Sequence, residues 1–133
     1  PHVYVASVNI GYNKEQYLKA IKEASLHNGP SLIIAYSPCI EHGIKTGMQH
    51  SQSNGYLATK CGYFLTFRYN PDTKKFSLDS KEPEFDKYED YLMTENRFAS
   101  LVRKDKERAR LLLEEQKQWA IDRYNYYKKI SEE

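Results

Sequence analysis

Residues 32–43 read Leu32-Ile33-Ile34-Ala35-Tyr36-Ser37-Pro38-Cys39-Ile40-Glu41-His42-Gly43, and this stretch decides the fold. A continuous apolar run that Ser-Pro ends abruptly is typical of a strand buried on both faces of a parallel sheet. Cys39 follows the carboxyl end of that strand, at the edge where parallel α/β sheets collect ligands and cofactors. This position makes Cys39 a candidate for metal or redox chemistry, although one thiolate cannot hold a metal alone.

The residues before this stretch predict a βαβ unit. Residues 3–8 form a β-branched and aromatic run that is typical of a strand. A helical pattern follows, with Asn13 as its N-cap and Gln16 completing a capping box. Asn28-Gly29-Pro30 is expected to end this helix, and residues 31–36 form the second strand. Strand, helix and strand in about 35 residues predict two parallel strands.

The residues after the stretch predict a helix, two strands and two more helices. A loose helical pattern runs from Met48 to Cys61, residues 63–69 form a strand, and residues 76–78 are its short hairpin partner. Helices are expected at about 85–100 and 104–130. The second of these carries an apolar stripe at spacings of three and four: Ala109, Leu112, Leu113, Trp119, Ala120, Tyr127 and Ile130.

The predicted fold class is therefore α/β, with helices at the C-terminal end. Residues 1–80 are expected to be the end of an α/β domain, and residues 81–133 a helical segment packed on it as one compact unit. The chain enters its first strand after two residues, which predicts a fragment of a larger protein.

Composition argues against several classes of protein. The 133 residues include 20 basic and 18 acidic side chains, a balance that does not favour nucleic-acid binding. Tyrosines alternate with basic residues over 123–129, but helical spacing assigns half of them to a core or interface. No apolar stretch approaches the roughly 18 residues of a membrane span. With no secretory signal and two cysteines, a reducing cytoplasm is the expected location.

Each candidate side chain also has a structural interpretation. An isolated cysteine such as Cys39 is more often a small buried hydrophobic residue than a ligand. His42 is a candidate for polarising a substrate or capping a helix, but a lone loop histidine is more often solvated or hydrogen-bonded. For Cys61, at the end of a helical pattern, a structural role is expected.

A longer set of residues resembles one known family. Residues 4–8 read Tyr-Val-Ala-Ser-Val, and residues 29–48 contain Gly-Pro-Ser-Leu-Ile-Ile-Ala-Tyr-Ser-Pro-Cys-Ile followed by His42-Gly43. Residues 61–63, 68–71 and the string Phe-Ser-Leu-Asp-Ser-Lys-Glu-Pro at 76–83 continue the resemblance in the same order. Together they resemble the C-terminal part of the pyruvate:ferredoxin (flavodoxin) oxidoreductases, over nearly the whole chain.

The resemblance implies a large homodimeric enzyme that uses thiamine diphosphate, Mg²⁺ and three [4Fe–4S] clusters. Such an enzyme decarboxylates pyruvate oxidatively, forms acetyl-coenzyme A and passes electrons to ferredoxin or flavodoxin. The matching fold is the C-terminal portion of a thiamine-diphosphate-binding fold. Cys39 matches the family cysteine that is the fourth ligand of the cluster nearest thiamine diphosphate.

The other three cysteine ligands of that cluster, and the Gly-Asp-Gly…Asn segment that holds Mg²⁺ and the diphosphate, belong to family segments that this sequence lacks. The fragment alone is therefore expected to be inactive and to bind no cofactor. Two alternatives stay open: another 2-oxoacid:ferredoxin oxidoreductase, or a non-catalytic interaction module that docks a partner through tyrosine and tryptophan side chains of the last helix.

Overall fold

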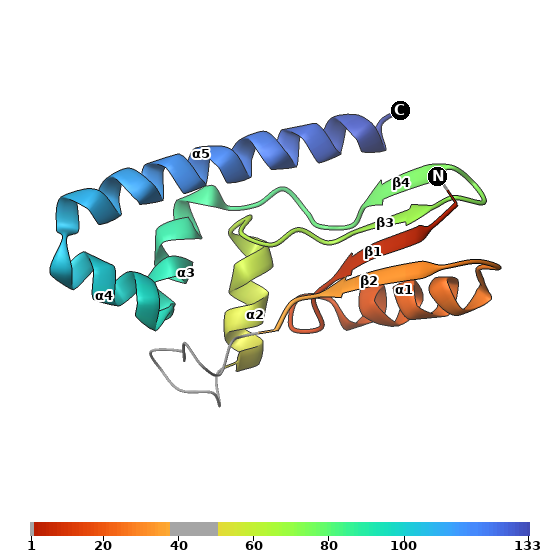
Figure 1. Ribbon diagram of the computed structural model, residues 1–133, viewed down its shortest axis with the longest axis horizontal. Coiled ribbons are helices and arrows are strands. Elements are labelled where there is room, and N and C mark those ends of the chain that lie inside the picture. Colours follow the sequence, from red (N-terminus) through yellow and green to blue (C-terminus); the bar gives the residue numbers. More distant parts are fainter. Residues whose placement is uncertain (1, 38–50) are drawn as a thin grey trace.

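The computed structural model describes residues 2–37 and 51–133, and it is an α/β structure (Figure 1). Helix α1 packs on one face of a four-stranded sheet. The long helix α5 runs along the β4 side of that sheet. The elements in chain order are β1 (Tyr4–Val8), α1 (Lys14–Leu26), β2 (Ser31–Ala35), α2 (Ser51–Lys60), β3 (Phe67–Asn70), β4 (Lys75–Leu78), η2 (Phe85–Lys87), α3 (Tyr88–Thr94), α4 (Asn96–Lys104) and α5 (Lys106–Ser131).

The sheet has the strand order β2-β1-β3-β4 and is mixed. β1 and β2 are parallel, with Tyr4 opposite Ser31, which confirms the predicted βαβ unit. β3 pairs antiparallel with β1, and β4 pairs antiparallel with β3. The predicted hairpin at the end of the sheet is therefore confirmed, and it makes the sheet mixed. A two-stranded hairpin necessarily adds an antiparallel pair.

Helix α1 begins as the sequence predicts. The Asn13 side chain accepts a hydrogen bond from the backbone N–H of Gln16, at 3.0 Å. The reciprocal half of the capping box is absent, because the Asn13 N–H donates to the carbonyl of Asn9. The Gln16 side-chain amide donates to Asp79 and to the carbonyl of Ser7. The helix ends at Leu26, a little before the predicted Asn28-Gly29-Pro30 stop.

One face of the sheet packs on α1. Tyr4, Ala6 and Val8 alternate along β1 and are buried against Ala20 of the helix. Arg68 of β3 lies opposite Ala6, so its side chain extends over the same face. Its guanidinium donates two hydrogen bonds to Asp79, at 2.8 and 2.9 Å, and two to Glu23 of α1, both at 3.0 Å. This half-buried cluster ties α1 to β3.

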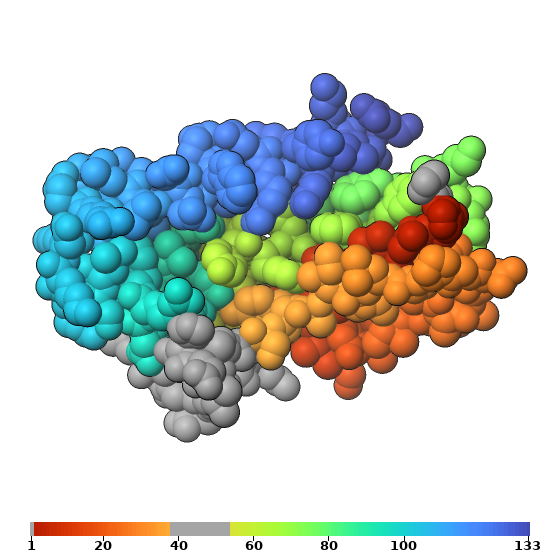
Figure 2. Space-filling view, in the orientation of Figure 1, coloured from red at the N-terminus to blue at the C-terminus, as the bar shows by residue number. Residues whose placement is uncertain are grey.

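β2 does not have the environment that its sequence predicts. Within the described residues it pairs only with β1 and so forms an edge of the sheet. Ile33 packs toward α1, but Leu32 and Ile34 point to the other face and are 53% and 43% exposed. In Figure 2 the β2 residues, in orange, reach the molecular surface. In this chain β2 is therefore not buried on both faces, because apolar composition does not reveal which neighbours a strand has.

Two other predicted elements have different bounds. β3 begins at Phe67, later than residue 63, because residues 61–64 form a turn and bend before it. The predicted helix 85–100 is divided into η2, α3 and α4. Glu95 interrupts it with an extended backbone, at φ −86° and ψ 124°.

The C-terminal helix α5 packs through only part of its predicted stripe. Ala109, Ala120 and Tyr124 are buried, and the Tyr127 ring packs against Phe67 and Phe76, with ring centroids 5.2 and 5.7 Å away. The expectation that Trp119 is buried is wrong: it is 69% exposed. Trp119 is one residue from Ala120, and one residue turns an α-helix by about 100°, so its side chain leaves the core face.

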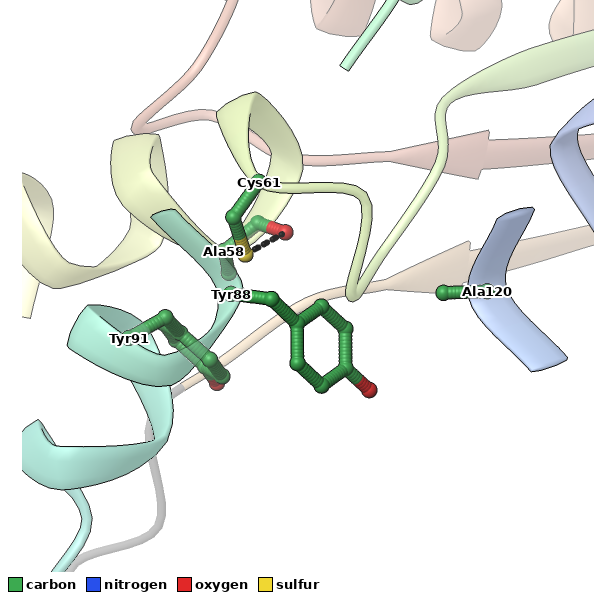
Figure 3. Packing of buried hydrophobic residues seen from close by; sticks show 5 residues of the cluster. All are labelled: Ala58, Cys61, Tyr88, Tyr91 and Ala120. Atoms are coloured by element: carbon green, nitrogen blue, oxygen red, sulfur yellow. Dashed lines mark hydrogen bonds between the residues drawn. The ribbon is translucent and has the colours of Figure 1, made fainter. Parts of the chain in front are cut away.

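A second core joins α2, α3 and α5 (Figure 3). Its buried members are Ala58, Cys61, Tyr88, Tyr91 and Ala120. This core places α3 beside the end of β2, because Tyr36 packs against the same cluster.

Candidate site at the carboxyl end of the parallel strands

The carboxyl ends of β1 and β2 meet at one edge, as in other parallel α/β units. Asn9 follows β1 and is buried. Its amide donates hydrogen bonds to the carbonyl of Gly55, at 2.7 Å, and to the Thr59 hydroxyl, at 2.8 Å. A Cβ atom on Gly55 would lie 3.3 Å from the Asn9 side-chain oxygen, so this close approach favours glycine. Asn9 therefore holds helix α2 against the end of β1.

Tyr36 follows β2 and begins a chain of hydroxyl hydrogen bonds. Its backbone N–H donates to the carbonyl of Val8, which continues the parallel pairing by one residue. The hydroxyls of Tyr36 and Tyr91 are 2.7 Å apart, and the Tyr91 hydroxyl donates to Glu95 at 3.2 Å. Either hydroxyl can be the donor in the Tyr36–Tyr91 bond.

These side chains line a hollow of about 300 Å³ at the end of β2. Its lining residues are Tyr36, Ser37, Tyr63, Tyr91, Leu92, Glu95, Arg97 and Phe98. The rings of Tyr63 and Tyr91 pack with centroids 4.7 Å apart. The hollow combines apolar ring faces with one carboxylate and one guanidinium.

Burial sets the protonation of this site. Loss of solvation is the main cause that raises the pKa of Tyr91, and the bond to Tyr36 adds to it. Burial also raises the pKa of Tyr36. Both hydroxyls stay protonated at neutral pH, so the pair offers hydrogen bonds and does not act as a base.

The sequence-predicted ligand Cys39 and the candidate His42 lie outside the described residues. Ser37, two positions before Cys39, is part of the hollow at the end of β2. The structure therefore describes the chain up to Ser37, and the role of Cys39 stays a prediction.

Cys61 has the structural role that the sequence predicts. It is fully buried in the core of Figure 3, and its Sγ lies 3.5 Å from the carbonyl oxygen of Ala58. Burial raises the pKa of this thiol to about 11. A protonated, buried thiol is neither a nucleophile nor a ready metal ligand.

Residues 2–37 and 51–133 contain no group of three or more His, Cys, Asp or Glu side chains that could hold a metal ion. Over the same residues, no helix combines the length and apolar content needed to cross a membrane.

The hydroxyl chain was not found by sequence reasoning. Tyr91 and Glu95 are four residues apart and helical spacing brings them together, which is a weak local signal. Their contact with Tyr36 joins positions 55 residues apart, and no pattern in the sequence indicates it.

Comparison with known proteins finds relatives that align with nearly the whole chain. No protein-family model matches it. It is 42% identical over 135 residues to a pyruvate-flavodoxin oxidoreductase of Enterobacter agglomerans and 42% identical over 136 residues to the pyruvate:ferredoxin oxidoreductase of Moorella thermoacetica. Each alignment covers 98% of the chain. The chain is homologous to one segment of the pyruvate-flavodoxin and pyruvate:ferredoxin oxidoreductases.

The pyruvate oxidoreductase relatives are much longer proteins. The chain spans 11% of the length of each of these two. A protein of Cryptosporidium parvum named pyruvate dehydrogenase [NADP(+)] is 38% identical over 144 residues, which cover 98% of the chain and 7% of that protein. The three names share pyruvate and differ in the electron acceptor.

Proposed function

We propose that this chain is the C-terminal part of a pyruvate:ferredoxin or pyruvate:flavodoxin oxidoreductase, also called pyruvate synthase. The complete enzyme would decarboxylate pyruvate oxidatively, form acetyl-coenzyme A and pass electrons through iron–sulfur clusters to ferredoxin or flavodoxin. The observation that carries the proposal is 42% identity over 98% of the chain with enzymes of both names. Pyruvate is the proposed substrate because it is common to the names of all three relatives.

Within that enzyme, we assign residues 1–80 to the end of the thiamine-diphosphate-binding α/β domain and residues 81–133 to a helical segment packed on it. The parallel β1-α1-β2 unit supports this assignment, because such a domain is built from parallel strands and crossover helices. The packing of Tyr127 on the β3–β4 hairpin supports a close contact between the two segments. We also propose that the complete enzyme is a cytoplasmic homodimer.

Cys39 is the proposed fourth ligand of the [4Fe–4S] cluster nearest thiamine diphosphate. Its support is the resemblance and its position three residues after Tyr36, at the carboxyl end of a parallel strand. Cys61 does not fit a ligand, since its thiol is buried and its pKa is raised. Bound there, the cluster would carry single electrons away from thiamine diphosphate. Asn9 and the Tyr36–Tyr91–Glu95 chain would hold the strand ends from which the Cys39 segment continues.

This segment matches relatives that are named for different electron acceptors. Relatives named for flavodoxin, ferredoxin and NADP(+) each match 98% or more of it. We propose that acceptor choice lies in other parts of the enzyme.

The decisive experiment compares two cysteine variants of the full-length enzyme. Cys39→Ala should lose the iron of one cluster and should transfer electrons to the carrier much more slowly. Cys61→Ala is the matched control and should keep every cluster. Iron analysis and electron paramagnetic resonance of the reduced proteins measure both. A full iron complement in Cys39→Ala would contradict the ligand assignment.

A further inference from the structure

A second hollow lies between α5, α3 and residues 63–64, and Tyr63 lines both hollows. We call it the Trp119 hollow, and its volume is about 300 Å³. Its lining residues are Tyr63, Phe64, Tyr88, Gln116, Trp119, Ala120 and Arg123. This volume is at the lower end of the range for small-molecule sites.

The Tyr88 hydroxyl in this hollow has no hydrogen-bond partner among the described residues. Tyr88 is only 3% exposed, and within residues 2–37 and 51–133 its hydroxyl makes no hydrogen bond to protein. Figure 3 shows its ring extending from α3 away from Cys61 and toward the side of Ala120. Burial raises the pKa of Tyr88 to about 12, so the hydroxyl is a donor at neutral pH. It is not one of the fully buried unpartnered atoms, so it is accessible from the hollow.

A second polar atom of the same hollow is also unpartnered. The Arg123 side chain is anchored, since its Nη2 donates to the carbonyls of Gly62 and Tyr63 at 3.0 and 2.7 Å. Its Nε is buried and has no hydrogen-bond partner among the described residues. A fixed guanidinium with an unused donor is suited to a carboxylate.

Aromatic rings surround these two donors. Tyr63, Phe64 and Trp119 line the hollow, and Trp119 and Tyr63 remain exposed although they are large apolar side chains. Ring faces of this kind bind a flat apolar group. The hollow thus offers an aromatic surface together with two donors and a positive charge.

We propose that the Trp119 hollow binds a small aromatic carboxylate, with its ring against Trp119 and Tyr63 and its carboxylate on the Arg123 guanidinium and the Tyr88 hydroxyl. Such a ligand gives the Tyr88 hydroxyl a partner, pairs with the charge of Arg123 and covers exposed aromatic surface at once. A neutral ring would leave the charge of Arg123 unused, and a carboxylate without a ring would leave the aromatic surface exposed. The proposal does not depend on the proposed enzymatic function.

Trp119 is the only tryptophan of the chain, so its fluorescence reports directly on the hollow. Benzoate titrated into the purified 133-residue chain should give a saturable change in Trp119 emission. Benzyl alcohol, which keeps the ring, and acetate, which keeps the carboxylate, should each bind at least about tenfold more weakly, because each loses one of the two interactions.

Three variants test the donors. Arg123→Gln should weaken benzoate binding by about tenfold or more, and Tyr88→Phe by about two- to tenfold. Arg103→Gln removes an exposed arginine of α4 with the same change in charge, and it should bind benzoate as the unaltered chain does. Circular dichroism and thermal melting check the fold of each variant. Should Arg123→Gln fail to fold, Tyr88→Phe still tests the site, because it removes only an unpartnered hydroxyl.

Three results would overturn the proposal. These are the absence of a saturable benzoate signal, equal binding of benzoate and benzyl alcohol, and undiminished benzoate binding by folded Tyr88→Phe. The second result would indicate a purely apolar surface that lies against another protein segment.

Discussion

At the scale of single residues, the interior of this chain keeps several ionisable groups neutral. Cys61 and Tyr88 belong to one core, and loss of solvation is the first cause of the raised pKa of each. A raised pKa in the folded state means that folding favours the protonated form. These groups contribute their full stabilisation when the pH is below their ordinary pKa values. That stabilisation is lost as the pH rises toward their pKa values in the folded state.

We therefore expect the chain to lose stability from about pH 9 upward. The ordinary pKa values are 9.0 for Cys61 and 10.0 for Tyr88, and folding raises them to about 11 and about 12. As the pH rises from the ordinary to the folded-state pKa of each group, the unfolding free energy should fall by on the order of 2–3 kcal/mol. Urea unfolding at pH 8, 9, 10 and 11 measures the decline. Cys61→Ala and Tyr88→Phe should each flatten it, and identical slopes in all three proteins would refute this explanation.

Trp119 should matter little to stability. Its side chain is 69% exposed, so Trp119→Ala should change the unfolding free energy by less than about 0.5 kcal/mol. The neighbouring Ala120 is buried against α2 and α3, and Ala120→Leu should destabilise the chain by about 1–3 kcal/mol through overpacking. Chemical denaturation of both variants makes the comparison. A loss of 3 kcal/mol or more in Trp119→Ala would show that the ring is buried in solution.

At the scale of elements, β2 combines a buried-strand sequence with an edge position. Residues 31–35 read Ser-Leu-Ile-Ile-Ala, yet Leu32 and Ile34 are exposed on the face opposite α1. An open edge with apolar side chains pairs readily with other chains. β2 is therefore the element most suited to bind another strand.

We expect the purified chain to self-associate through β2. Leu32→Lys should lower the association measured by sedimentation velocity or light scattering, because a lysine on an edge strand opposes pairing. Leu18→Lys is the matched control: Leu18 on α1 is 55% exposed and Leu32 is 53% exposed. The control should associate as the unaltered chain does. A clean monomer at high concentration, without any substitution, would disprove the edge argument.

At the scale of the whole molecule, this chain aligns with about a tenth of its longer relatives. It spans 11% of the Enterobacter and Moorella enzymes. Its sequence contains no Gly-Asp-Gly motif for Mg²⁺ and diphosphate, and the resemblance places three of the four cluster ligands elsewhere. The proposed chemistry thus requires the rest of such an enzyme.

The isolated 133-residue chain should consequently bind no thiamine diphosphate. Isothermal titration with thiamine diphosphate and Mg²⁺ should give no saturable heat, and reconstitution with iron and sulfide should leave no [4Fe–4S] spectrum. Circular dichroism confirms that the titrated protein is folded. Tight Mg²⁺-dependent binding would show that this segment holds the cofactor by itself.

The sequence by itself determined the family and most of the elements. The βαβ unit, the Asn13 cap, the β3–β4 hairpin and the long last helix all follow from local signals, because caps, turns and periodicity act over a few residues. The structural role of Cys61 was also predictable from its place at a helix end.

Only the tertiary structure decided which surfaces are covered. The edge position of β2, the exposure of Trp119 and the meeting of Tyr36 with Tyr91 depend on contacts between distant segments. An apolar pattern indicates that a side chain favours burial, but it does not indicate which distant residues will cover that side chain. For the same physical reason, only the packing of α3 against α5 brings Tyr88 and Arg123 together in the Trp119 hollow.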